Sequence, residues 1–199
     1  MTTGKFTDMT LPIQFKLAYR TITSDLLTLC EYVDPCEANK AAYSHRTFEL
    51  FLRTCTELEN LWKYILRNNC CPDPEEKWNI TSYVQVEKVY NYRLSTKEVC
   101  FVYWKPDPTP RYLKPFDGWL DNVKGQPVLA WYAAYNRVKH NRESNFHEAS
   151  MENLILSIAA LHVNLQAVFG NEVFFHQSMP KMFSVSGLPE AFLLFHIKA

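Results

Sequence analysis

The chain has 199 residues, enough to bury one good core and too few for two ordinary domains to be the default expectation. Hydrophobic residues make up 47% and charged residues 21%, a balance that excludes an intrinsically disordered chain. Lysine plus arginine equal aspartate plus glutamate at 21 each, so no overall field attracts nucleic acid or an anionic membrane. Any site for a polyanion therefore has to be a local patch.

Two long helices are predicted in the first third of the chain. Residues 12–33 carry an irregular apolar stripe that Asp34-Pro35 ends, and residues 44–68 carry a strong one. The apolar positions of the second helix recur at three- and four-residue steps: Phe48, Phe51, Leu52, Cys55, Leu58, Trp62, Ile65 and Leu66. A shorter helix is predicted at residues 82–93.

A strand and a loop follow these helices. Residues 99–104 form an apolar and aromatic run that predicts a buried strand, and the four prolines in residues 105–115 predict a loop. Residues 173–175 and 192–197 are expected to form short strands that could join the strand at 99–104. A small β element should therefore accompany the helices.

Two strong helices are predicted in the second half, at residues 127–140 and 151–169. Pro127 stands at the favoured first position of the earlier helix, and Gly170 stands where a left-handed cap would end the later one. Asn145 has capping-box spacing to Glu148, and Ser150 is the competing cap. His162 lies in the apolar seam, which predicts a core histidine rather than a ligand.

Cysteine usage and the N-terminal residues predict a cytoplasmic protein with reduced thiols. No CxxC pair occurs, and Cys70 and Cys71 are too close together for the usual zinc geometry, so we expect neither a metal nor another cofactor. Residues 1–10 lack the layout of a signal peptide. Polar side chains interrupt the most apolar long run, residues 154–169, which argues against a membrane span.

The segment at residues 136–147 concentrates the residue types of catalytic sites. Arg137, Lys139 and Arg142 stand with a single acid, Glu143, and make a local cationic patch suited to phosphate. The candidate catalytic residues are Arg142 and His147, and the candidate substrate-binding residues are Asn136, Arg137, Lys139, His140 and Asn141.

The two histidines of this segment are expected at opposite helix ends. His140 ends one helix, and His147 falls in the first turn of the next if Asn145 is its cap. Opposite ends of helix dipoles then act on the two rings, as separate acid and base roles require. The alternative is ordinary capping and solvation of a helical turn. Glu57 and Glu59 are expected to be solvated charges rather than a carboxylate pair.

These residues resemble the HEPN superfamily, small helical-bundle proteins of prokaryotic toxin, phage-defence and RNA-processing systems. The hallmark of that family is an Arg followed, after four to six residues, by a His near the junction of two helices, and Arg142-Glu-Ser-Asn-Phe-His147 has that spacing. Helix order extends the resemblance over residues 44–170. Active members usually have Asn, Asp or His directly after the Arg, whereas this chain has Glu143.

The resemblance implies a mainly α fold, an up-and-down bundle of four to five helices with a small peripheral β element. We expect one domain over residues 1–199, a motif-bearing core at residues 44–170 and a β-like extension at residues 171–199.

The resemblance also implies a metal-independent endoribonuclease, in which the RNA 2′-hydroxyl attacks the adjacent phosphate. His147 would move the proton, Arg142 would stabilise charge on the phosphoryl oxygens, and Asn136, Lys139 and His140 would position or assist. The implied partners are RNA or a nucleotide, a second copy in a homodimer, and a cognate antitoxin or partner protein, without a membrane. Two alternatives stay open: a non-catalytic nucleotide-binding or protein-interaction module, and a structural protein whose turn is merely solvated.

Overall fold

The computed structural model describes residues 10–69, 74–89, 93–105, 111–123, 126–127, 129–170, 174 and 182–185. Within these residues the fold is mainly helical with short antiparallel strands, which confirms the predicted class. The long helices are α1 (Thr10–Tyr32), α2 (His45–Asn68), α5 (Ala130–His140) and α7 (Met151–Phe169). The predicted helices at residues 12–33, 44–68 and 151–169 are confirmed to within two residues at each end.

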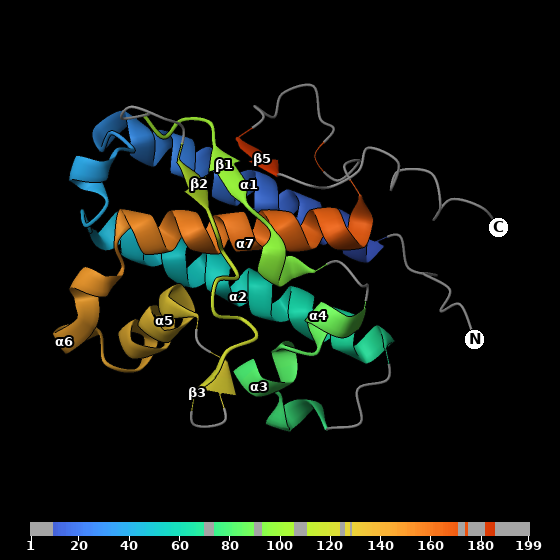
Figure 1. Ribbon diagram of the computed structural model, residues 1–199. Helices are drawn as coiled ribbons and strands as arrows, with labels where there is room; N and C mark the ends of the chain where they lie inside the picture. The colour runs from blue at the N-terminus through green and yellow to red at the C-terminus, as the bar shows by residue number, and fades with distance from the viewer. Residues whose placement is uncertain are drawn as a thin grey trace.

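α2 and α7 form the centre of the molecule and run in the same direction. A backbone bridge joins Tyr43 and Ser150, the residues just before the two helices begin. Further along both helices, the indole Nε1 of Trp62 donates a 3.2 Å hydrogen bond to Oδ1 of Asn164. Figure 1 shows α7 crossing the middle of the molecule with α2 beside it.

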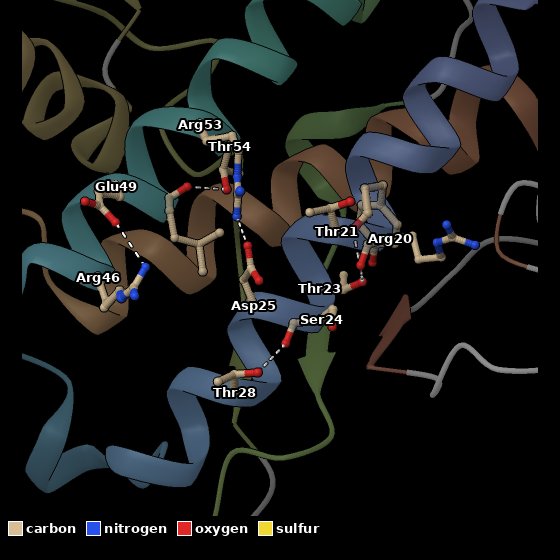
Figure 2. A network of polar contacts seen from close by, with 12 residues as sticks. Arg20, Thr21, Thr23, Ser24, Asp25, Thr28, Arg46, Glu49, Arg53 and Thr54 are labelled. Carbon is tan, nitrogen blue, oxygen red and sulfur yellow. Dashed lines mark hydrogen bonds and ion pairs between the residues drawn. The ribbon is translucent and has the colours of Figure 1, made fainter.

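α1 packs against this central pair and runs in the opposite direction. Phe15, near the start of α1, lies 5.7 Å from the ring of Tyr64 near the end of α2. Further along α1, Asp25 pairs with Arg53, which is nearer the start of α2 (Figure 2). Because surface ion pairs contribute only about 0–1 kcal/mol, apolar burial has to hold α1 in place.

Three threonine hydroxyl groups of α1 form hydrogen bonds within the helix. Thr21, Thr23 and Thr28 donate to carbonyl oxygens of α1 itself, four residues earlier in each case (Figure 2). The hydrogen-bonding needs of these hydroxyl groups are therefore met within α1.

α5 also runs against the direction of the central pair. Tyr132 lies 5.9 Å from the ring of Trp62, and Tyr135, one turn later, lies 6.2 Å from Phe51, which is earlier in α2. Successive long helices thus alternate in direction along the chain.

A three-stranded antiparallel sheet, in the order β2-β1-β5, packs on α7 beside α1 (Figure 1). β1 (Val99–Phe101) is its central strand, β2 is Tyr112–Leu113 and β5 is Phe183–Val185. Phe101 faces its partner Phe183 with ring centroids 5.2 Å apart, and Phe183 lies 5.4 Å from the ring of His162 on α7.

His162 is a core histidine, as predicted. Its ring is 7% exposed and stacks on Phe174 at 4.2 Å, and its Nδ1 lies 2.7 Å from the hydroxyl oxygen of Tyr19. It connects α7 with both α1 and the sheet.

The helix predicted at residues 127–140 begins later than expected. Pro127 instead belongs to β4 (Gln126–Pro127), which pairs with β3 (Asn122–Val123), and the extended Leu129 precedes α5. A proline fits a short edge strand as well as it fits a helix start, so the residue type alone did not decide between them.

The helix predicted at residues 82–93 is two separate turns, α3 (Ile80–Tyr83) and α4 (Val86–Val89). Between them the backbone forms 3₁₀-type hydrogen bonds, which span three residues: Gln85 N donates to the Ser82 carbonyl, and Glu87 N donates to the Val84 carbonyl. Residues 90–92 lie outside the described residues. The short helices η2 (Glu75–Lys77) and η3 (Leu94–Thr96) flank these turns, and η1 (Glu37–Asn39) follows α1.

The β predictions were correct in kind and imprecise in position. β1 stops at Phe101 because the chain turns there, with Trp104 N donating to the Phe101 carbonyl. The predicted loop at residues 105–115 contains β2, although residues 106–110 are not described. A strand after Gly170 does join β1, but it is β5. Phe174, the described residue of the strand predicted at 173–175, is in a 3₁₀ turn, and residues 173, 175 and 192–197 lie outside the described part.

α7 is the helix in the described chain that is long and apolar enough to cross a membrane, by length and composition alone. Of its most apolar window, 67% is buried by the rest of the fold. Packing against α1, α2, α5 and the sheet accounts for its apolar character.

Replacing Asn164 by Ala should lower the free energy of unfolding by roughly 1–3 kcal/mol, because the buried indole N–H of Trp62 would lose its acceptor. Chemical denaturation measures this change. The matched control is Asn60→Ala, at an exposed position on α2, where a change within about 0.5 kcal/mol is expected. Equal effects of the two substitutions would contradict the role given to the Trp62–Asn164 bond.

Candidate functional site

The loop before α2 is attached to the first turn of α7. Met151 N donates to the Ala42 carbonyl at 2.8 Å, and Glu152 N donates to the Lys40 carbonyl at 3.0 Å. Asn153 N donates to Oγ of Ser150 at 3.3 Å. The first amides of α7 therefore have protein acceptors and are not open to an anion.

Of the two candidate caps, Ser150 is the N-cap of α7 and Asn145 is not. His147 consequently lies in η4 (Phe146–Glu148), before α7, rather than in the first turn of α7. The α7 dipole therefore does not act on His147 as expected, and only His140 lies at the end of a long helix.

A short turn links α5 to η4. α6 (Arg142–Asn145) is capped by Asn141, whose Oδ1 accepts from Ser144 N at 3.3 Å. The Asn145 side chain donates to the Asn141 carbonyl at 2.8 Å. Asn141, predicted to bind substrate, thus holds the turn that carries Arg142.

Six side chains gather at this end of the bundle, and we call them the Phe146 cluster: Tyr43, His45, Phe48, Arg142, Phe146 and His147. The Phe146 ring lies 4.9 Å from His45, 5.5 Å from Tyr43 and 5.7 Å from Phe48. The His147 ring lies 6.5 Å from Tyr43. The cluster combines exposed imidazoles with an aromatic floor.

Arg142 completes the cluster as a cation available to a ligand. Its guanidinium carbon lies 5.3 Å from the centroid of Phe48, and the residue is exposed. In the described part of the chain no carboxylate forms an ion pair with it, including the adjacent, exposed Glu143. Glu143 therefore does not neutralise Arg142 by direct pairing.

Arg137, by contrast, already has an anionic partner. Its Nε donates to both carboxylate oxygens of Glu148, at 2.7 and 3.0 Å, and Nη2 makes a third contact. Hydrogen bonding by Arg137 lowers the pKa of Glu148, and the same bonds raise the pKa of Arg137. Arg137 therefore links α5 to η4.

Lys139 is also held by the fold. Its Nζ lies 3.1 Å from the Tyr135 hydroxyl and 3.9 Å from Oε2 of Glu59 on α2. The Tyr132 hydroxyl donates to Oε1 of Glu59 at 2.7 Å. The prediction that Glu59 is solvated was wrong, because its side chain is only 16% exposed and binds two groups of α5.

The remaining predicted residues lie on α5 outside the cluster. Asn136 is half-buried, and His140 is the exposed last residue of the helix. Because Arg137 and Lys139 have anionic partners, fewer cations are available to a ligand than the sequence suggested. Among the described cations of this patch, Arg142 is the arginine without an ion pair.

His45 was missed by the sequence prediction. Nothing near it in the sequence suggests a site, and only the attachment of its loop to α7 brings it to Phe146. The single local signal was the predicted helix start at Ser44, whose side chain accepts from Thr47 N.

Burial disfavours the thiolate form of two described cysteines. Cys55 is fully buried, and burial raises the pKa of its thiol well above the ordinary range. Burial also raises the pKa of Cys30, to about 11. Cys30, Cys36, Cys55 and Cys100 are free, and Cys70 and Cys71 lie outside the described residues.

Across the described ranges, no group of three or more His, Cys, Asp or Glu side chains has an arrangement that could hold a metal ion. Comparison with protein-family models, with curated proteins and with solved structures gave no match. The functional argument therefore depends on the geometry of the Phe146 cluster.

The pairing of Glu148 with Arg137 should make stability depend on pH. A lowered folded-state pKa contributes stability above the ordinary glutamate pKa of about 4.3, and that contribution disappears as the pH falls through the folded value. The gap in unfolding free energy between wild type and Glu148→Gln should therefore narrow on acidification from about pH 6.

Denaturant titrations at several pH values test this expectation. The control is Glu143→Gln, an exposed acid five residues earlier without an ion pair in the described residues, for which only a small change in unfolding free energy is expected. A Glu148→Gln gap that stayed constant with pH would contradict the assignment.

Proposed function

We propose that this chain is a HEPN-like protein that binds RNA at the Phe146 cluster and cleaves it without a metal ion. The observation that carries the proposal is that exposed Arg142 and exposed His147 both contact aromatic rings of the Phe146 cluster, and that Arg142 forms no ion pair with any described carboxylate. A guanidinium is suited to the phosphoryl oxygens, and an imidazole is suited to proton transfer near neutral pH.

The reaction proposed is attack of the RNA 2′-hydroxyl on the adjacent phosphate. Arg142 stabilises the negative charge that develops on the phosphoryl oxygens, and His147 transfers a proton. Asn141 positions Arg142 through the α6 cap, and the Arg137–Glu148 pair fixes η4 and therefore His147. The aromatic rings offer stacking surface to bases.

We further propose a homodimer, because two copies would double the cationic charge that a neutral chain presents to RNA. Association with an antitoxin or another partner protein, in a cytoplasmic toxin, defence or RNA-processing system, is part of the same proposal.

A second candidate is a nucleotide-binding or protein-interaction module without turnover. The ion pair of Arg137 and the contacts of Lys139 favour it, because they leave little net positive charge for a long polyanion. It uses the same cluster and predicts binding without cleavage.

The test is incubation of purified protein in EDTA with mixed-sequence, single-stranded RNA, scoring products for cyclic-phosphate ends. Wild type should cut, and His147→Ala should be slower by about 10²- to 10⁴-fold, the usual contribution of general acid–base catalysis. Arg142→Ala should also lose activity and should bind RNA more weakly. The control is Asn60→Ala, at an exposed position of α2 outside the Phe146 cluster, which should cut like wild type.

Three results discriminate the proposals. Equal cutting by wild type and His147→Ala would overturn the mechanism. Binding of RNA or nucleotide without products would favour the second candidate. Absence of both, in wild type, would exclude both candidates.

A further inference from the structure

We propose that His45 is the second proton-transfer group of the Phe146 cluster, acting opposite His147. This assignment rests on the proposed ribonuclease function, and it replaces His140 as the partner of His147.

His45 is held in place from two sides. It is the first residue of α2, directly after the capping box in which Ser44 and Thr47 exchange hydrogen bonds. Its ring packs against Phe146 at 4.9 Å while the residue remains exposed. The backbone is therefore fixed, and the imidazole is open to a ligand.

The two histidines are attached to one aromatic pair. His147 contacts Tyr43, His45 contacts Phe146, and Tyr43 and Phe146 contact each other edge to face. Arg142 reaches the same group of rings through Phe48. Two imidazoles and one guanidinium thus lie around a common floor.

In-line transesterification calls for two proton-transfer groups. The bond from the 2′-oxygen to phosphorus forms as the bond from phosphorus to the 5′-oxygen breaks, so the two oxygens are on opposite sides of the phosphorus. One imidazole accepts the 2′-hydroxyl proton, and the other, as imidazolium, gives a proton to the departing 5′-oxygen. The products are a 2′,3′-cyclic phosphate and a free 5′-hydroxyl.

The other described histidines do not fit the second role. His140 ends α5 and makes no ring contact with the cluster. His162 is buried between Tyr19 and Phe174 in the core. Of the described histidines, His45 is the one that joins His147 in the cluster.

The experiment uses the full chain and a pair of single-stranded oligoribonucleotides, one normal and one with sulfur in place of the bridging 5′-oxygen at a single linkage. A thiolate leaves without protonation, so loss of the general acid should harm cleavage of the normal linkage only. The variants are His45→Gln, His147→Gln and the control Asn60→Gln, at an exposed position of α2 outside the Phe146 cluster, each checked by thermal melting.

His45→Gln and His147→Gln should each cut the normal linkage about 10²- to 10⁴-fold more slowly than wild type. Whichever variant lacks the general acid should recover most of its rate on the sulfur linkage, and the other should stay slow. Binding of an uncleavable 2′-deoxy analogue should be within a few-fold of wild type for both. Asn60→Gln should match wild type on both substrates.

His45→Phe separates chemistry from packing, because a phenyl ring keeps the contact with Phe146 and cannot carry a proton. Near-wild-type cutting by His45→Phe or His45→Gln would overturn the assignment, as would failure of the sulfur linkage to rescue either histidine variant. Failure of wild type to cut either substrate would instead overturn the proposed ribonuclease function, and His45 with it.

Discussion

The attachment of residues 40–43 to the start of α7 is the constraint on which the arrangement of the site depends. Ala42 and Lys40 supply carbonyl oxygens to the amides of Met151 and Glu152, and Tyr43 bridges Ser150. Four amides at a helix start need partners outside the helix, so this contact stabilises α7 as well as the loop. It also brings the start of α2 beside η4, which creates the Phe146 cluster.

Charge pairing then decides which of the neighbouring cations can meet a ligand. Arg137 is bound to Glu148, and Lys139 is held by Tyr135 near Glu59. Both contacts connect α5 to other elements, so the charges are used to position the helix. Arg142 lies over Phe48 and forms no ion pair with a described carboxylate.

Much of the helical framework could be predicted because its signals are local and repeated. α2 and α7 carry long apolar periodicities, and Ser44, Ser150 and Gly170 punctuate them. The predictions of the shorter elements failed where a local signal was ambiguous. Pro127 could begin a helix or sit in a strand, and the β3–β4 pairing selected the strand.

The site was less predictable because its partners come from distant parts of the chain. The spacing of Arg142 and His147 drew attention to the turn between α5 and α7, but the sequence could not show that Glu148 pairs with Arg137 and that Glu59 lies near Lys139. His45 could not be found at all without the contact between the α2 start and η4. Hydrophobic periodicity fixes which face is buried, whereas it says nothing about which helix ends meet.

The polar groups inside α7 connect this site to the rest of the bundle. Asn164 is bonded to Trp62 of α2, and His162 is bonded to Tyr19 of α1. Two helices in apolar contact could slide past each other at a small cost in free energy. A buried hydrogen bond between them would be broken by the same movement. These bonds therefore fix the register of α7 against α1 and α2 at its far end, while the bridge from Tyr43 fixes it at the near end. With both ends set, η4 cannot move along the helix axis relative to α2, and the Phe146 cluster keeps its rings in contact.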